Sequence, residues 1–142
     1  MPPKIRKKRK PQKSRDLEVN AEAIRILRTV KNEESFYFYE AIGKPTGESA
    51  RSLSDFLEKI KTVKLESLQF HLQRKDFQNW IEKTLGDSNL ARKIERISPS
   101  NDEVLRTKIQ SNVESRLKEL KEASIPLLVN ENLTVASLSS VS

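Results

Sequence analysis

The chain has 142 residues and a formal net charge of +7, with 35% hydrophobic and 33% charged residues. This length suits one small domain with extensions. It has no cysteine and only one histidine, which excludes disulfide scaffolds, cysteine nucleophiles and thiolate metal sites. No run of about 18 apolar residues is present, and no apolar segment follows the basic start, so we expect neither a membrane span nor a secretory signal.

The positive charge is concentrated at the N-terminus. Residues 1–15 contain no acidic residue and eight basic ones: Lys4, Arg6, Lys7, Lys8, Arg9, Lys10, Lys13 and Arg15. The rest of the chain has 19 basic and 20 acidic residues, a formal charge of −1. With three prolines and only two other apolar residues, this segment cannot bury enough surface to offset its ordering entropy. We therefore predict a disordered basic arm over residues 1–16.

Such an arm attracts polyanions, because its cations neutralise phosphates and release their counterions. The arm contains no aromatic residue, so we expect contact with a phosphate backbone rather than stacking on bases. A solubilising tail and, in a nucleated cell, a nuclear-import signal are the alternatives. Fully extended, the arm reaches at most about 50 Å, far enough to touch a surface beyond the folded body.

A helical domain is predicted over residues 17–123, and its first part contains one helix and one extended segment. Apolar residues recur at helical spacing over about 21–30, with Asn20 as the cap. Four consecutive aromatic residues at 36–39 favour an extended segment, and the Gly- and Pro-containing residues 43–47 are expected to form a loop. That loop is no P-loop, because Phe38 and Pro45 occupy positions that need Gly and Ser or Thr.

The middle of the domain is predicted to be helical, with one ambiguous stretch. Ser52 and Asp55 form a capping box before an amphipathic helix that ends near residue 63. Residues 65–73 fit a strand or a helix. Asp76 is then expected to cap a helix that ends at Gly86, where glycine supplies a left-handed stop.

Two further helices complete the predicted domain. Asp87 or Ser88 begins one that ends at Ser98-Pro99, and a Ser100–Glu103 capping box precedes another over about 102–122. The apolar stripe of the last helix covers too few heptads for a long coiled coil but allows a helix-pair dimer contact; it contains Leu105, Ile109, Val113, Leu117 and Leu120.

Residues 124–142 are predicted to be a flexible apolar and Ser-rich C-terminal tail that docks on the body, adds an edge strand or binds a partner. The fold class is therefore mainly α, with four to five helices and one short extended aromatic segment.

The most distinctive residues lie close together in the sequence: His71, Arg74, Asp76 and Trp80. His71 paired with Asp76 has the form of an oriented general base, but no Ser or Thr stands in a nucleophile context, and a structural histidine is the commoner role. Trp80 is best interpreted as core. One histidine without cysteine and without EF-hand spacing indicates no metal site. We therefore assign no catalytic residue, metal or cofactor and keep the four residues as a candidate functional cluster.

The spacing of these residues also carries a resemblance. The pattern Phe70-His71, Arg74, Asp76-Phe77 and Trp80, within residues 36–97, resembles an uncharacterised archaeal and bacterial domain family of unknown function. The resemblance implies a prokaryotic, cytoplasmic origin and no established activity. The arm and the C-terminal extension lie outside it.

The function predicted from the sequence is a non-enzymatic, nucleic-acid-associated binding protein whose basic arm contacts phosphate backbones without sequence preference. One alternative is a protein–protein adaptor or homodimer that uses helix 102–122 and the C-terminal tail. Another is a small enzyme or anionic-ligand binder built around His71, Arg74 and Asp76.

Overall fold

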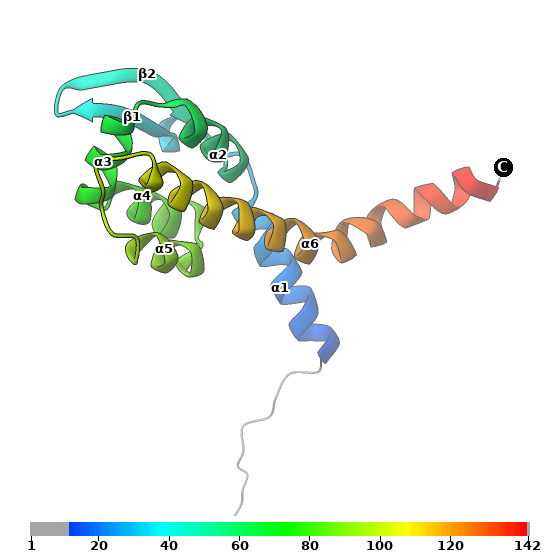
Figure 1. Cartoon of the computed structure of the whole chain (residues 1–142). Helices are drawn as coiled ribbons and strands as arrows, with labels where there is room; N and C mark the ends of the chain where they lie inside the picture. Colours follow the sequence, from blue (N-terminus) through cyan, green and yellow to red (C-terminus); the bar gives the residue numbers. More distant parts are fainter. Residues whose placement is uncertain (1–11, 142) are drawn as a thin grey trace, which may run out of the picture.

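The computed structural model describes the backbone of residues 12–141 and the side chains of residues 18–125. This part of the chain is mainly helical, as predicted, with six α-helices and one two-stranded antiparallel sheet. Figure 1 shows the hairpin and helices α3, α4 and α5 gathered at one end of the molecule. Helix α6 starts at that end, packs on α1 and α2, and continues beyond them (Figure 1).

Helix α1 (Gln12–Ile26) begins and ends earlier than the predicted 21–30. The helix ends at Ile26 because the following residues make other contacts: the amide of Val30 donates to the carbonyl of Arg51 (2.7 Å). The Arg28 guanidinium donates to the carbonyl of Thr84 (2.8 Å), close to Gly86. Of the predicted arm, residues 1–11 lie outside the described residues, and the backbone of residues 12–16 belongs to α1.

A short 3-10 turn, η1 (Asn32–Glu34), leads into a β-hairpin of β1 (Phe36–Ala41) and β2 (Lys44–Ala50). The predicted extended aromatic segment is confirmed, whereas the loop predicted at 43–47 is wrong. Gly43, with φ +75°, makes the turn, and the following residues pair with β1 as an edge strand, where proline is tolerated. The hydroxyl of Thr46 also donates to the carbonyl of Phe38 (2.9 Å).

The next two elements are helices. Helix α2 (Leu53–Thr62) begins as predicted, since the Ser52 hydroxyl accepts from the amide of Asp55 (3.1 Å). The ambiguous stretch is helix α3 (Leu65–Arg74). Its buried residues follow a helical period and not the alternation of a strand; they are Ser67, Leu68, His71 and Leu72.

One helical segment from Asp76 to Leu85 changes its hydrogen-bonding pattern along its length. Helix α4 (Asp76–Asn79) continues into the π-helical segment η2 (Trp80–Leu85). Gly86 (φ +89°) ends it in the left-handed region, as predicted, and its amide bonds to the carbonyl of Ile81 (3.0 Å). Helix α5 (Ser88–Glu95) follows, capped by the Asp87 carboxylate, which accepts from the amide of Leu90 (3.1 Å).

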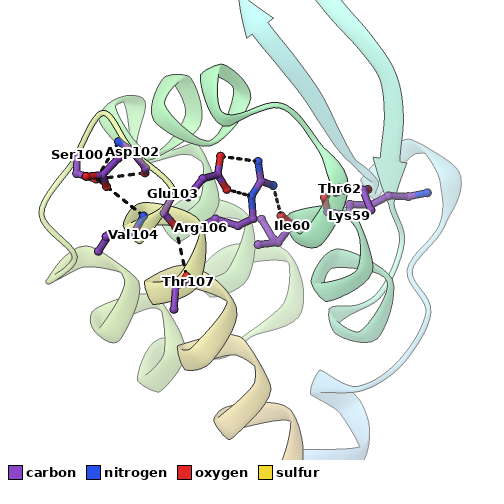
Figure 2. A network of polar contacts seen from close by, with 9 residues as sticks. All are labelled: Lys59, Ile60, Thr62, Ser100, Asp102, Glu103, Val104, Arg106 and Thr107. Atoms are coloured by element: carbon purple, nitrogen blue, oxygen red, sulfur yellow. Dashed lines mark hydrogen bonds and ion pairs between the residues drawn. The ribbon is translucent and has the colours of Figure 1, made fainter.

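Helix α6 (Val104–Val141) is longer than predicted, and the backbone of the predicted C-terminal tail belongs to it as far as residue 141. The Ser100–Glu103 capping box is wrong, because Asp102 accepts the first amide, that of Val104 (3.1 Å) (Figure 2). Glu103 instead holds Arg106, whose guanidinium donates to the last-turn carbonyl of Ile60 in α2 (2.7 Å) (Figure 2). Among the described helices, none is long and apolar enough to cross a membrane.

The core lies between α6, α1, α2 and the hairpin. All five residues of the predicted α6 stripe are buried: Leu105, Ile109, Val113, Leu117 and Leu120. This apolar face of α6 therefore packs inside the domain. A second part of the core is a cluster of aromatic rings in mutual contact, formed by Phe36, Phe38, Phe56, Phe77 and Trp80.

A buried ion pair joins α6 to the start of α5. The Asp87 carboxylate, 1% exposed, receives two hydrogen bonds from the Arg116 guanidinium (2.8 and 3.1 Å).

Because a buried carboxylate without its cation is costly, we expect Arg116→Ala to lower the free energy of unfolding by about 3 kcal/mol or more. Lys118→Ala removes an exposed cation of the same helix and is expected to change the free energy of unfolding by less than about 0.5 kcal/mol. Urea denaturation of both variants tests this, and equal losses would contradict it.

Candidate functional site

His71 is held at both ring nitrogens. Its Nε2 accepts a hydrogen bond from the backbone amide of Tyr39 in β1 (2.8 Å), so that nitrogen carries no proton. Its Nδ1 therefore carries the proton and donates to the Asp76 carboxylate (2.9 Å). The residue is 3% exposed, and its ring lies among aromatic rings, with Phe36 at 4.7 Å between ring centroids. In this arrangement neither nitrogen is available to a substrate or a metal ion.

Burial lowers the pKa of His71 below its ordinary value, and the hydrogen bond and charge of Asp76 oppose that shift only in part. The neutral ring is also the form that the geometry requires, because a proton on Nε2 would face the donor N–H of Tyr39. The arrangement is that of a structural histidine, which is the commoner of the two roles that the sequence left open.

Asp76 links the histidine to Arg74. One of its carboxylate oxygens receives both the Nδ1 proton of His71 and the Nε proton of Arg74 (3.0 Å). The predicted N-cap role of Asp76 is wrong: the preceding Lys75 stands at the cap with φ +65°, and no side chain caps α4 there. The carboxylate is engaged by the histidine and the arginine instead.

The structure brings together three of the four predicted cluster residues and places the fourth elsewhere. Trp80 is buried in the aromatic core, and its indole N–H donates to the carbonyl of Glu34 (2.8 Å). It does not line the cavity beside Arg74 and Asp76. The interpretation of Trp80 as core is therefore confirmed.

A cavity of about 460 Å³ lies between β1 and α3. Its walls are mostly aromatic and apolar, with the Arg74–Asp76 ion pair at one side. The Arg74 guanidinium lies over the Phe70 ring, 5.1 Å from its centroid. The buried His71 forms part of the wall and fixes the position of Asp76.

A second cavity, of about 430 Å³, lies between α5 and α6. Three cationic side chains line it, those of Lys93, Arg96 and Lys108, together with Ile97, Ser98 and Asn112. No acidic residue lines this basic cleft. None of the three cations makes an ion pair or side-chain hydrogen bond with any described residue. Such a concentration of uncompensated positive charge attracts anions.

The formal charge of −1 over residues 16–142 gives no sign of the basic cleft. A sum says nothing about which charges share a surface. The available signal was the group of Arg92, Lys93 and Arg96 at the C-terminal end of α5, but Lys108 joins it only through the packing of α6 on α5. The predicted arm contacts Lys4, Arg6, Lys7, Lys8, Arg9 and Lys10 lie outside the described residues, as do the side chains of Lys13 and Arg15.

Among the described residues, no group of three or more His, Asp or Glu side chains is placed to hold a metal ion. With both nitrogens of His71 engaged, the described residues form two candidate binding surfaces: an aromatic cavity and a basic cleft.

The fold is a small, mainly helical domain with one β-hairpin, and comparison with known families identifies the family to which this domain belongs. A family model described as a family of unknown function, DUF5752, matches residues 14–114. The chain belongs to this family, which confirms the resemblance seen within residues 36–97 and extends it to α1 and the start of α6. No curated protein and no solved structure matches the chain. Both cavities lie inside the matched residues.

The lowered pKa of His71 makes a prediction about stability and pH. Between its folded pKa and its unfolded value of about 6.5, the unfolded chain binds more protons, so stability rises with pH. The contribution is complete above about pH 6.5 and is lost as the pH falls below that value. We expect the free energy of unfolding to fall between pH 7.5 and 5.5.

The control is His71→Gln, whose amide oxygen can accept from the Tyr39 N–H but does not titrate. Urea denaturation at several pH values measures both proteins. The fall in stability is expected to be smaller in the variant, and identical pH profiles would contradict the assignment of the neutral, structural imidazole.

Proposed function

We propose that the protein is a non-enzymatic, nucleic-acid-associated binding protein that contacts phosphate backbones without sequence preference. The observation that carries the proposal is the basic cleft, in which Lys93, Arg96 and Lys108 gather without an acidic partner. The basic N-terminal arm supports it from the sequence. A cytoplasmic location belongs to the same proposal.

The cleft gathers three cations around one hollow that no acidic residue lines, whereas several other cations of the described residues pair with acids. Three of these pairs join different elements: Lys59 pairs with Glu48, Lys64 with Glu40 and Lys75 with Glu95. Three uncompensated cations around one hollow repel one another and are relieved by a bound anion. A phosphate supplies that charge, and neutralising it releases counterions from the nucleic acid.

The chemistry of the cleft favours backbone contact over base readout. Lysine and arginine side chains bind phosphate oxygens, which carry no sequence information. No aromatic side chain lines the cleft, so it offers no platform for stacking. The hydroxyl of Ser98 adds a neutral donor beside the cations. Affinity from this surface is therefore expected to depend on salt and to be indifferent to sequence.

The arm would add to the same contact. Helix α1 begins at Gln12, so the arm's first six cations, Lys4 to Lys10, precede a helix that packs on α6. An arm tethered to a domain that already holds a phosphate chain meets further phosphates at high effective concentration. Cleft and arm together would therefore bind more tightly than either alone.

Charge reversal in the cleft tests its role. We expect the triple variant Lys93→Glu, Arg96→Glu and Lys108→Glu to weaken binding of labelled single-stranded and duplex oligonucleotides. The slope of log Kd against log salt concentration is expected to decrease by roughly 2 to 3, since each of the three lost phosphate contacts contributes about 0.7 to 0.9 to it. Fluorescence anisotropy across a salt series measures both quantities.

A matched control carries the same charge change on other exposed surfaces: Lys44→Glu, Lys83→Glu and Lys118→Glu. If this control lost as much affinity as the cleft variant, net charge alone would explain binding, and the cleft would have no special role.

Removal of the arm tests the other half of the proposal. A protein lacking residues 1–11 keeps α1 whole and loses six cations, so we expect weaker binding and a smaller salt slope with a nearly unchanged melting temperature. Anisotropy and thermal unfolding measure these effects. Unaltered binding by the truncated protein would show that the arm does not contact nucleic acid.

A further inference from the structure

We propose that the cavity between β1 and α3 binds an unpaired nucleobase by stacking, so that the nucleic acid the protein holds is single-stranded. This inference rests on the proposed function, because the basic cleft would hold the backbone whose base enters this cavity. It concerns a different surface, built from different residues.

The cavity offers aromatic faces and exposed apolar surface. Tyr37 and Tyr39 follow each other at alternate positions of β1, and Phe70 faces the cavity from α3. Tyr37 is 53% exposed, and Ile42 at the hairpin turn is 82% exposed. Exposed aromatic and apolar side chains gathered around one hollow mark a binding surface.

The charge of the cavity favours a neutral ligand. Arg74 and Asp76 are the only ionisable pair of opposite charge in its lining, and their direct ion pair (3.0 Å) cancels the net charge. His71 is neutral in the observed hydrogen-bonding arrangement. A phosphate gains little here, whereas a nucleobase is planar, neutral and apolar on its faces. The two cavities therefore suit the two different parts of a nucleotide.

Polar atoms with spare hydrogen-bonding capacity line the same cavity. The side-chain hydroxyls of Ser35 and Tyr39 bond to no described residue, and neither do the terminal nitrogens of Arg74. These groups can meet the donors and acceptors on the edge of a base while its face lies on a ring. The Arg74 guanidinium is itself a flat surface, positioned by Asp76 and by the Phe70 ring.

The arrangement is organised before any ligand arrives. His71 fixes both the backbone of β1 at Tyr39 and the carboxylate of Asp76, which in turn holds Arg74. The pairing of β1 with β2 shifts register between Tyr37 and Tyr39, and such irregularities redirect side chains at binding sites. Stacking demands an unpaired base, because a duplex hides the base faces.

The experiment compares Tyr37→Ala with Tyr37→Phe. The phenylalanine keeps the ring and loses only the hydroxyl, which donates to the carbonyl of Asn32 (3.2 Å). Each protein is titrated by anisotropy with a single-stranded RNA and with a strand of equal length built of abasic residues. We expect Tyr37→Ala to weaken binding of the ordinary strand about fivefold or more, with an unchanged salt slope. Tyr37→Ala should bind the abasic strand with the affinity of the wild-type protein. Tyr37→Phe should bind both strands with wild-type affinity.

A second measurement does not depend on the phosphate backbone. An uncharged nucleoside, adenosine, is titrated into the ¹⁵N-labelled protein at millimolar concentration. We expect amide shifts centred on Tyr37, Tyr39 and Phe70 that disappear in Tyr37→Ala.

The outcomes separate the two proposals. Wild-type affinity of Tyr37→Ala for the ordinary strand, or no nucleoside shifts at these amides, would overturn the stacking site. A loss confined to the cleft variant would leave the proposed function standing alone. Amide shift changes on addition of adenosine, together with an absence of salt-dependent strand binding, would contradict the proposed function and support the stacking site.

Discussion

The buried imidazole of His71 is the contact on which this end of the molecule depends. It joins three elements, because it lies on α3, accepts from the backbone of β1 and donates to Asp76 at the start of α4. A two-stranded hairpin is at best marginally stable alone. Here the histidine and the aromatic rings of Phe36 and Phe38 attach it to the helices. The aromatic cavity therefore depends on the neutral state of one side chain.

The sequence predicted those parts of the fold whose causes are local. The α2 cap at Ser52 and the stop at Gly86 follow from residue types at short spacings, and both were confirmed. The strand β2 was missed because Lys, Pro and Gly favour a loop, and only its pairing with β1 makes it a strand. Helix α3 remained ambiguous for a similar reason, since tertiary contacts decide which of its residues are buried.

In the candidate site, too, the sequence predicts what depends on local spacing and misses what depends on tertiary packing. The proximity of His71, Arg74 and Asp76 could be anticipated, because they lie within six residues of one another. Their role could not, because the partner that occupies Nε2 is a backbone amide 32 residues away. The lining of the basic cleft spans only residues 93–112, but its cations share one hollow only because α5 and α6 pack together across the connection at 96–103. Sequence spacing finds neighbours within an element and misses surfaces shared between elements.

The two proposed surfaces contribute different things to one ligand. The cleft and the arm act through charge, which gives affinity that salt weakens and that any phosphate chain can satisfy. The aromatic cavity is electrically neutral, so stacking there would add affinity that salt barely changes and that only an exposed base can supply. Preference for single strands would then come from Tyr37 and Phe70, and overall strength from the cations. Because both cavities lie within the matched residues 14–114 and the arm's first six cations do not, the domain itself would carry the selectivity and the arm would only raise the affinity.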